Sequence, residues 1–91
     1  MTGLVGAVFT EHARRQMARR GIEEAQVRLT IETPEWSAEI RPGRVVAQRT
    51  FTRETPPRAF LLRVFVDIDR NPPEIVTGYW TSRIGKYRSS P

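Results

Sequence analysis

The spacing of apolar residues changes once along this chain, from a helical period to strict alternation. Near the start, apolar residues recur every fourth position and Thr10 is a favourable N-cap, so a helix is predicted over 11–20. Gly21 is typical of the residue that follows a helix. A second helix is predicted over 23–32, because Pro34 disfavours helical backbone at the residue before it.

The second predicted helix carries two apolar stripes. One consists of Ile22, Ala25 and Leu29, and the other of Val27 and Ile31. One stripe can face a sheet, and we expect the other to pack on the first helix or on a partner.

Beyond residue 34 the apolar positions alternate, which predicts strands. The predicted strands span 36–41, 44–51, 59–68 and 74–81. Because the connections are short, this order predicts an α+β fold with two N-terminal helices packed on one face of a four-stranded antiparallel β-sheet, as a single domain over 1–91. In the last predicted strand, alternation places four residues on one side of the strand: Ile75, Thr77, Tyr79 and Thr81.

The strand over 59–68 has the strongest alternation. Its even-numbered positions are apolar, and Arg63 lies on the opposite face with Leu61, Phe65 and Asp67. An arginine in mid-sheet is costly unless it pairs with an acid or faces solvent, and Asp67 is two pleats away. Arg63 is therefore either an anchor for a phosphate or an ordinary residue on a solvated face.

Charge narrows the class of partner. The formal net charge is +5, with 15 basic and 10 acidic residues, and every basic residue except Lys86 is arginine. The planar guanidinium stays charged and can bind a phosphate through two hydrogen bonds. This excess favours an acidic polymer as partner, with RNA the leading prediction, although an arginine-rich proteome would give the same composition.

The residues and segments that the sequence lacks disfavour several other classes of protein. It has no cysteine and one histidine, so we predict no disulfide and no thiolate or conventional transition-metal site. It contains no apolar run of about 18 residues and no secretory signal, so we predict a cytoplasmic protein without membrane contact.

His12 is the natural residue for proton transfer, because its ordinary pKa lies near neutrality. On the predicted helix it aligns with Gln16 and Arg20 and turns toward the body of the protein. Either His12 and Arg20 border a catalytic cleft, or they make structural hydrogen bonds to strand ends and the second helix. A lone helical histidine is more often structural.

The end of the chain combines hydroxyls, cations and aromatic rings within ten residues, 79–88. Bases stack on aromatic rings, while arginine and lysine hold phosphates. The residues of interest are Tyr79, Thr81, Arg83, Lys86, Tyr87 and Arg88. The alternative is that the rings close the core and the cations keep the tail soluble.

Two motifs resemble a family of small bacterial proteins. One is the opening Phe9-Thr10-Glu11-His12-Ala13, followed by Met17 and Arg20-Gly21-Ile22. The other is the final strand Val76-Thr77-Gly78-Tyr79-Trp80-Thr81-Ser82 with a closing Tyr87. That family looks like a branch of the RelE/ParE-type toxins, which share a fold with barnase, EndoU and colicin RNases.

The resemblance implies metal-independent RNA cleavage by 2′-hydroxyl attack on the neighbouring phosphate, in a toxin of a type II toxin–antitoxin pair. It also implies that the reaction needs no cofactor. Expected partners are RNA, as mRNA or on the ribosome, and a cognate antitoxin. The predicted catalytic residues are His12, Arg63, Thr81, Arg83 and Tyr87. The predicted nucleic-acid-binding residues are Arg20, Arg49, Tyr79, Lys86 and Arg88.

Alternatives stay open at this point. Gln16 replaces an arginine that the family pattern places before the methionine, so Arg15 or Arg20 would have to substitute for it if that arginine binds phosphate. ParE-type relatives act on DNA gyrase, so a non-catalytic binder of nucleic acid or gyrase is the second hypothesis. A third is an inert member held by a partner through Val27 and Ile31. The oligomeric state is not predicted.

Overall fold

The protein is described by a computed structural model covering residues 4 and 6–87 of the 91-residue chain. It has the α+β class that the sequence predicts. The elements are β1 (Val8–Phe9), α1 (Glu11–Arg19), α2 (Glu24–Glu32), β2 (Trp36–Arg41), β3 (Arg44–Arg53), β4 (Arg58–Asp67), β5 (Glu74–Thr81) and α3 (Ile84–Tyr87).

The strands form one mixed sheet of five strands in the order β1-β5-β4-β3-β2. Strands β2 to β5 make the expected antiparallel meander. Strand β1 adds a parallel edge, with Val8 opposite Glu74 and Phe9 opposite Ile75. The prediction of a four-stranded antiparallel sheet was therefore wrong at this edge. The cause is that β1 has only 2 residues, too few for alternation to be visible.

Local signals define both N-terminal helices. The Thr10 hydroxyl accepts a hydrogen bond from the Ala13 amide at 3.0 Å and caps α1. The backbone then reverses at Gly21, whose φ of 70° is in the left-handed region. The Gln26 side chain accepts from the Glu23 amide at 3.0 Å and caps α2. Within the described residues no helix is both long and apolar enough to cross a bilayer.

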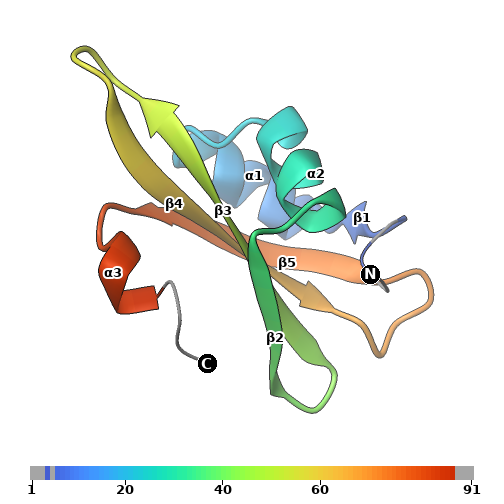
Figure 1. The fold of residues 1–91 in the computed structure, drawn as a ribbon. Coiled ribbons are helices and arrows are strands. Elements are labelled where there is room, and N and C mark those ends of the chain that lie inside the picture. The colour runs from blue at the N-terminus through green and yellow to red at the C-terminus, as the bar shows by residue number, and fades with distance from the viewer. Residues whose placement is uncertain (1–3, 5, 88–91) are drawn as a thin grey trace.

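Helices α1 and α2 cover one face of the sheet, and α3 lies on the other side (Figure 1). We call the face covered by α1 and α2 the helix face, and the face on the α3 side the open face. The core lies on the helix face, where Val27 and Ile31 are 0% and 2% exposed. The alternative in which this stripe contacts a partner is therefore wrong. Of the other stripe, Ile22 is buried while Leu29 is 40% exposed.

A β-bulge in β5 changes which side chains share a face. Phe65 lies opposite Thr77, whereas its neighbour Val66 lies opposite Ile75, so β5 has one extra residue at this point. Ile75 packs in the core on the helix face. Beyond the bulge, Tyr79 lies opposite Arg63 on the open face. The prediction that Ile75 and Tyr79 share a side was wrong, because a bulge interrupts the alternation of side chains.

Candidate nucleic-acid interface

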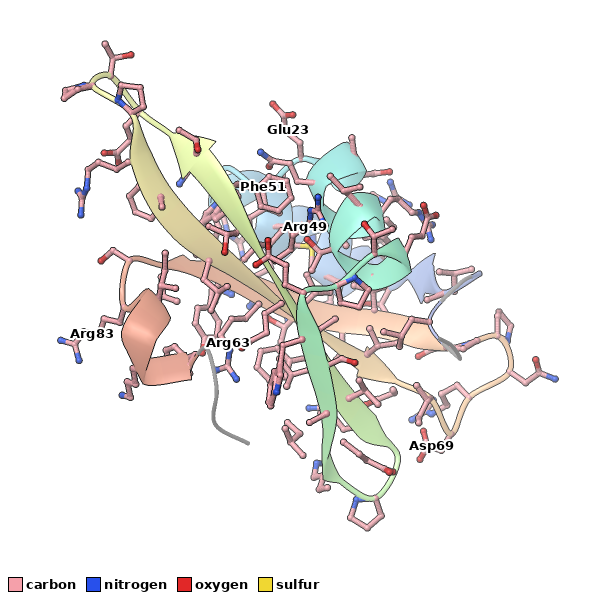
Figure 2. All side chains as sticks on the ribbon, viewed as in Figure 1. Glu23, Arg49, Phe51, Arg63, Asp69 and Arg83 are labelled. Atoms are coloured by element: carbon pink, nitrogen blue, oxygen red, sulfur yellow. The ribbon has the colours of Figure 1, made fainter. Side chains whose placement is uncertain are left out.

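A row of side chains crosses the open face of the sheet. Trp36 on β2 lies opposite Gln48 on β3, and Gln48 lies opposite Arg63 on β4. Arg63 in turn lies opposite Tyr79 on β5. We call these four residues the cross-strand row. Figure 2 shows Arg63 on the α3 side of the sheet, away from α1 and α2.

The guanidinium of Arg63 is held in place from three directions. Its Nε donates to the side-chain oxygen of Gln48 at 2.7 Å, and its Nη1 donates to the Tyr79 hydroxyl at 2.6 Å. The Tyr87 ring lies 4.0 Å from the centre of the guanidinium, in a cation–π contact. Its Nη2 donates to no group among the residues that the structure describes. A guanidinium in a fixed orientation, with Nη2 as a further donor, is suited to binding an anion.

Gln48 links the sheet to the end of the chain. It is only 1% exposed, and its Nε2 donates to the backbone oxygen of Tyr87 at 2.9 Å. The same amide accepts from Arg63, so both ends of the side chain are used. The position of Tyr87 therefore depends on a buried residue in the middle of β3.

Three neighbours favour ionisation of Tyr87. The hydrogen bond with the Tyr79 hydroxyl, followed by the positive charges of Lys86 and Arg63, lowers the pKa of the Tyr87 phenol, although partial burial acts in the opposite direction. A lowered pKa raises the fraction of phenolate near neutral pH, and the phenolate is the form that accepts a proton. The row and Tyr87 thus bring a fixed cation beside a phenol whose ionisation is favoured.

Among the described residues, Arg63 forms no ion pair. Asp67, on the same face, is bound to Arg44 by two hydrogen bonds of 2.7 and 3.0 Å. Within the described part of the chain, no carboxylate lies within 4.0 Å of Arg63. The sequence argument that Asp67 is too far to pair with Arg63 is confirmed. No described carboxylate therefore neutralises the charge of Arg63.

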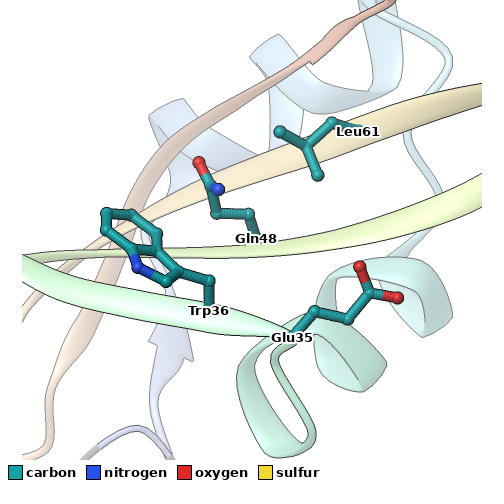
Figure 3. A pocket seen from close by; sticks show the side chains of 4 residues that line it. All are labelled: Glu35, Trp36, Gln48 and Leu61. Carbon is teal, nitrogen blue, oxygen red and sulfur yellow. The ribbon is translucent and has the colours of Figure 1, made fainter. Parts of the chain in front are cut away.

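A pocket of about 260 Å³ adjoins the row and is lined by Glu35, Trp36, Gln48 and Leu61. Figure 3 shows the indole of Trp36 and the carboxylate of Glu35 at opposite ends, with Gln48 and Leu61 between them. The Glu35 Oε1 accepts from the amide and the hydroxyl of Thr50 at 3.1 and 2.8 Å. We call this the Glu35 pocket. Its walls combine an aromatic ring, an apolar side chain and polar groups.

Several residues that the sequence proposed lie away from this row. His12 is exposed on α1, which packs on the helix face, so the sheet separates it from Arg63. The expectation that His12 turns toward the body of the protein was wrong. Arg20 donates to the Gly78 backbone oxygen at 2.7 Å, and Arg49 donates to the Thr33 oxygen at the end of α2 at 2.7 Å. Both arginines have structural partners.

Gln16, which stands where the family pattern has arginine, lies on α1 on the helix face. Gln16 accepts a hydrogen bond from the Thr77 hydroxyl, and Arg20 contacts the same hydroxyl at 3.4 Å. These contacts fasten α1 to β5. Arg15 pairs with Glu11 along the helix at 3.0 Å. Arg15 and Arg20 thus bind groups of the protein itself.

The remaining predicted residues surround α3. The Thr81 hydroxyl accepts from the Arg83 amide at 3.0 Å and shapes the turn into the helix. Lys86 lies 5.3 Å from the centre of the Tyr87 ring. Figure 2 shows Arg83 on the far side of α3 from Arg63, pointing away from it. Arg88 lies outside the described residues.

A family model covers most of the chain. Residues 9–80 match the model described as "Domain of unknown function (DUF4258)". The chain belongs to the DUF4258 family. No curated protein and no solved structure matches it.

The boundaries of the DUF4258 match divide the site. All four members of the cross-strand row lie inside residues 9–80, and so does Glu35. Tyr87 and the rest of α3 follow the matched region. Among the described residues of this DUF4258 domain, no group of three or more His, Cys, Asp or Glu side chains is placed to hold a metal ion.

The sequence argument missed Gln48, Trp36 and Glu35. A usable signal existed in the loop over 54–57, since a hairpin that pairs Arg53 with Arg58 also places Gln48 opposite Arg63. Counting back from that loop would have identified the buried partner of the arginine in mid-sheet. No comparable signal indicates that α3 folds back over the row.

Proposed function

We propose that this DUF4258 domain is a metal-independent endoribonuclease that acts as the toxin of a toxin–antitoxin pair. The observation that carries the proposal is the Arg63 guanidinium, held by Gln48 and Tyr79 and stacked on Tyr87 without a counterion among the described residues. The basic composition of the chain supports a polyanionic substrate. In this proposal the substrate is RNA, as mRNA or on the ribosome, and a cognate antitoxin blocks the open face.

The proposed reaction needs a base, an acid and a cation. The base takes the proton of the 2′-hydroxyl, and the freed oxygen attacks the adjacent phosphorus. The bond from phosphorus to the 5′-oxygen breaks, and that oxygen takes a proton from the acid. The products are a 2′,3′-cyclic phosphate and a 5′-hydroxyl. Negative charge grows on the phosphoryl oxygens during this step, so a fixed cation beside them lowers the barrier.

The residues of the open face fit these roles better than His12 does. Tyr87, with its lowered pKa, serves as the base. Arg63 binds the phosphate through its Nη2 and stabilises the transition state. Lys86, 5.3 Å from the Tyr87 ring, or solvent supplies the proton to the leaving oxygen. His12 is separated from this group by the sheet and has no part in the reaction.

The first prediction is that cleavage depends on Tyr87 and not on His12. Purified protein is incubated with 5′-labelled single-stranded RNA in excess EDTA, and the product ends are analysed for a 2′,3′-cyclic phosphate. Tyr87→Phe keeps the ring under Arg63 but removes the hydroxyl, so we expect the rate to fall about 100-fold or more, as for loss of a general base. His12→Ala should cleave at the wild-type rate.

Two results would reject this assignment. Full cleavage by Tyr87→Phe would show that the phenol is not the base. Binding of RNA by wild-type protein without any product would favour the alternative, a non-catalytic binder. That alternative has one observation in its favour, since two of the Arg63 nitrogens already donate to protein groups.

A further inference from the structure

The Glu35 pocket shares a wall with the proposed phosphate site. Gln48 lines the pocket and also accepts from Arg63, so the two sites lie side by side on the open face. Trp36 and Arg63 are two strands apart in the cross-strand row. Two strand spacings amount to about 10 Å, which is the scale of one nucleotide.

The size and the aromatic wall of the pocket suit a single base. At about 260 Å³ it is smaller than the sites of about 300–1,000 Å³ that hold drug-sized ligands. The indole of Trp36 at one end offers a surface on which a base can stack. Leu61 adds an apolar side chain to the lining of the pocket.

The polar groups of the pocket select among the bases. Both hydrogen bonds that Glu35 accepts from Thr50 go to Oε1, so its Oε2 accepts none from the described residues. Guanine presents two adjacent donors, N1–H and the N2 amine, to such an oxygen. Adenine would direct its N1 lone pair at the carboxylate. Cytosine and uracil offer one donor each and a smaller stacking surface.

We propose that the Glu35 pocket binds a guanine base of single-stranded RNA, with Trp36 stacked on the base and Glu35 accepting from its N1–H and N2 amine. This inference rests on the proposed function, because it takes Arg63 as the neighbouring phosphate site. It adds a preference for guanine next to the bound phosphate. The pocket would thereby determine which phosphodiester lies at Arg63.

The test measures binding and does not depend on cleavage. Four fluorescent RNA hexamers are titrated against the full chain by anisotropy. Each has uridine at five positions and guanine, adenine, cytosine or uracil at the fourth, with 2′-fluoro-ribose throughout to prevent attack. We expect the guanine oligomer to bind about tenfold more tightly than the other three, because a paired set of hydrogen bonds to one base gives discrimination of about that size.

Variants assign the preference to the carboxylate. Glu35→Gln keeps an oxygen for Thr50 but presents an amide donor to the base, so we expect the guanine preference to disappear while the uridine oligomer binds at least as well. Glu32→Gln is the matched control, since it removes the same charge from an exposed residue at the end of α2. It should retain the full preference. Trp36→Ala should weaken the binding of all four oligomers.

The outcomes separate this inference from the proposed function. Equal binding of the four oligomers by wild-type protein, or an unchanged preference in Glu35→Gln, would overturn the guanine pocket even if RNA is cleaved. A guanine preference that depends on Glu35 would support the pocket even if the cleavage assay shows no product.

Discussion

At the scale of single residues, a buried amide determines where the central arginine points. The Gln48 side chain is buried and lies between a cation and a backbone oxygen, and both of its polar atoms have partners. A buried polar group that loses its partner costs more than the net value of the hydrogen bond, because the remaining group stays desolvated. Gln48 therefore positions Arg63 and Tyr87 together.

Replacing Gln48 in two ways distinguishes its structural role from its electrostatic one. Gln48→Leu leaves the Arg63 Nε and the Tyr87 oxygen without their partner, so we expect the free energy of unfolding to fall by about 1–3 kcal/mol. Gln48→Glu keeps an acceptor for Arg63 but replaces the donor to the Tyr87 oxygen with a carboxylate oxygen and buries a negative charge, so we expect a loss of stability of similar size and a larger loss of RNA affinity. Urea unfolding and anisotropy measure the two effects. Equal RNA affinities in both variants would contradict this role.

At the scale of elements, the sequence pattern predicted the helix and strand bounds that depend on local signals such as capping and alternation. The starts of α1 and β5 are where capping and alternation place them, and β4 is displaced by one residue from the predicted 59–68. The bulge in β5 was not predictable, because the extra residue Val76 leaves the apolar pattern around it plausible. The cross-strand row was missed for a related reason. Its members come from four strands, and only the register between strands brings them together.

An ion pair connects β3 and β4 at the end opposite their hairpin loop. Arg44 and Asp67 face each other across the strands and are 27% and 15% exposed. The hydrogen bond from Arg44 lowers the pKa of Asp67, and the same bond raises the pKa of Arg44. Because the pair is largely shielded from solvent, it stabilises the sheet more than an exposed pair does.

The lowered pKa of Asp67 predicts a loss of stability in acid. Its contribution is fully present above the pKa of an unfolded aspartate, about 3.9, and is lost as pH falls through the lower folded-state pKa. Asp67→Asn should lower the free energy of unfolding at pH 7 by about 1–3 kcal/mol and flatten its decline between pH 5 and 2. Urea unfolding across this range tests both effects. Glu54→Gln, in an exposed pair with Arg58, is the control and should change neither.

At the scale of the whole molecule, cations lie on both sides of the sheet, and some of them are paired with carboxylates. On α1, Arg14 and Arg15 pair with Glu24 and Glu11. On the opposite side, Arg83 and Lys86 have no carboxylate within 4.0 Å among the described residues. Part of the net charge of +5 therefore lies near α3, where Lys86 flanks Tyr87. An RNA strand on the open face would neutralise these cations.

The salt dependence of RNA binding tests which side of the molecule carries the nucleic acid. Each phosphate neutralised on a single strand contributes about 0.7 to the slope of log affinity against log salt concentration. Replacing Arg83 and Lys86 together with glutamine should therefore reduce the slope by about 1.4. Replacing Arg15 and Arg19 on α1 together removes the same charge from the helix side and should leave the slope nearly unchanged. Equal reductions of the slope in the two double variants would mean that RNA is held by diffuse charge over the whole surface. That result would reject the open face as the RNA-binding site.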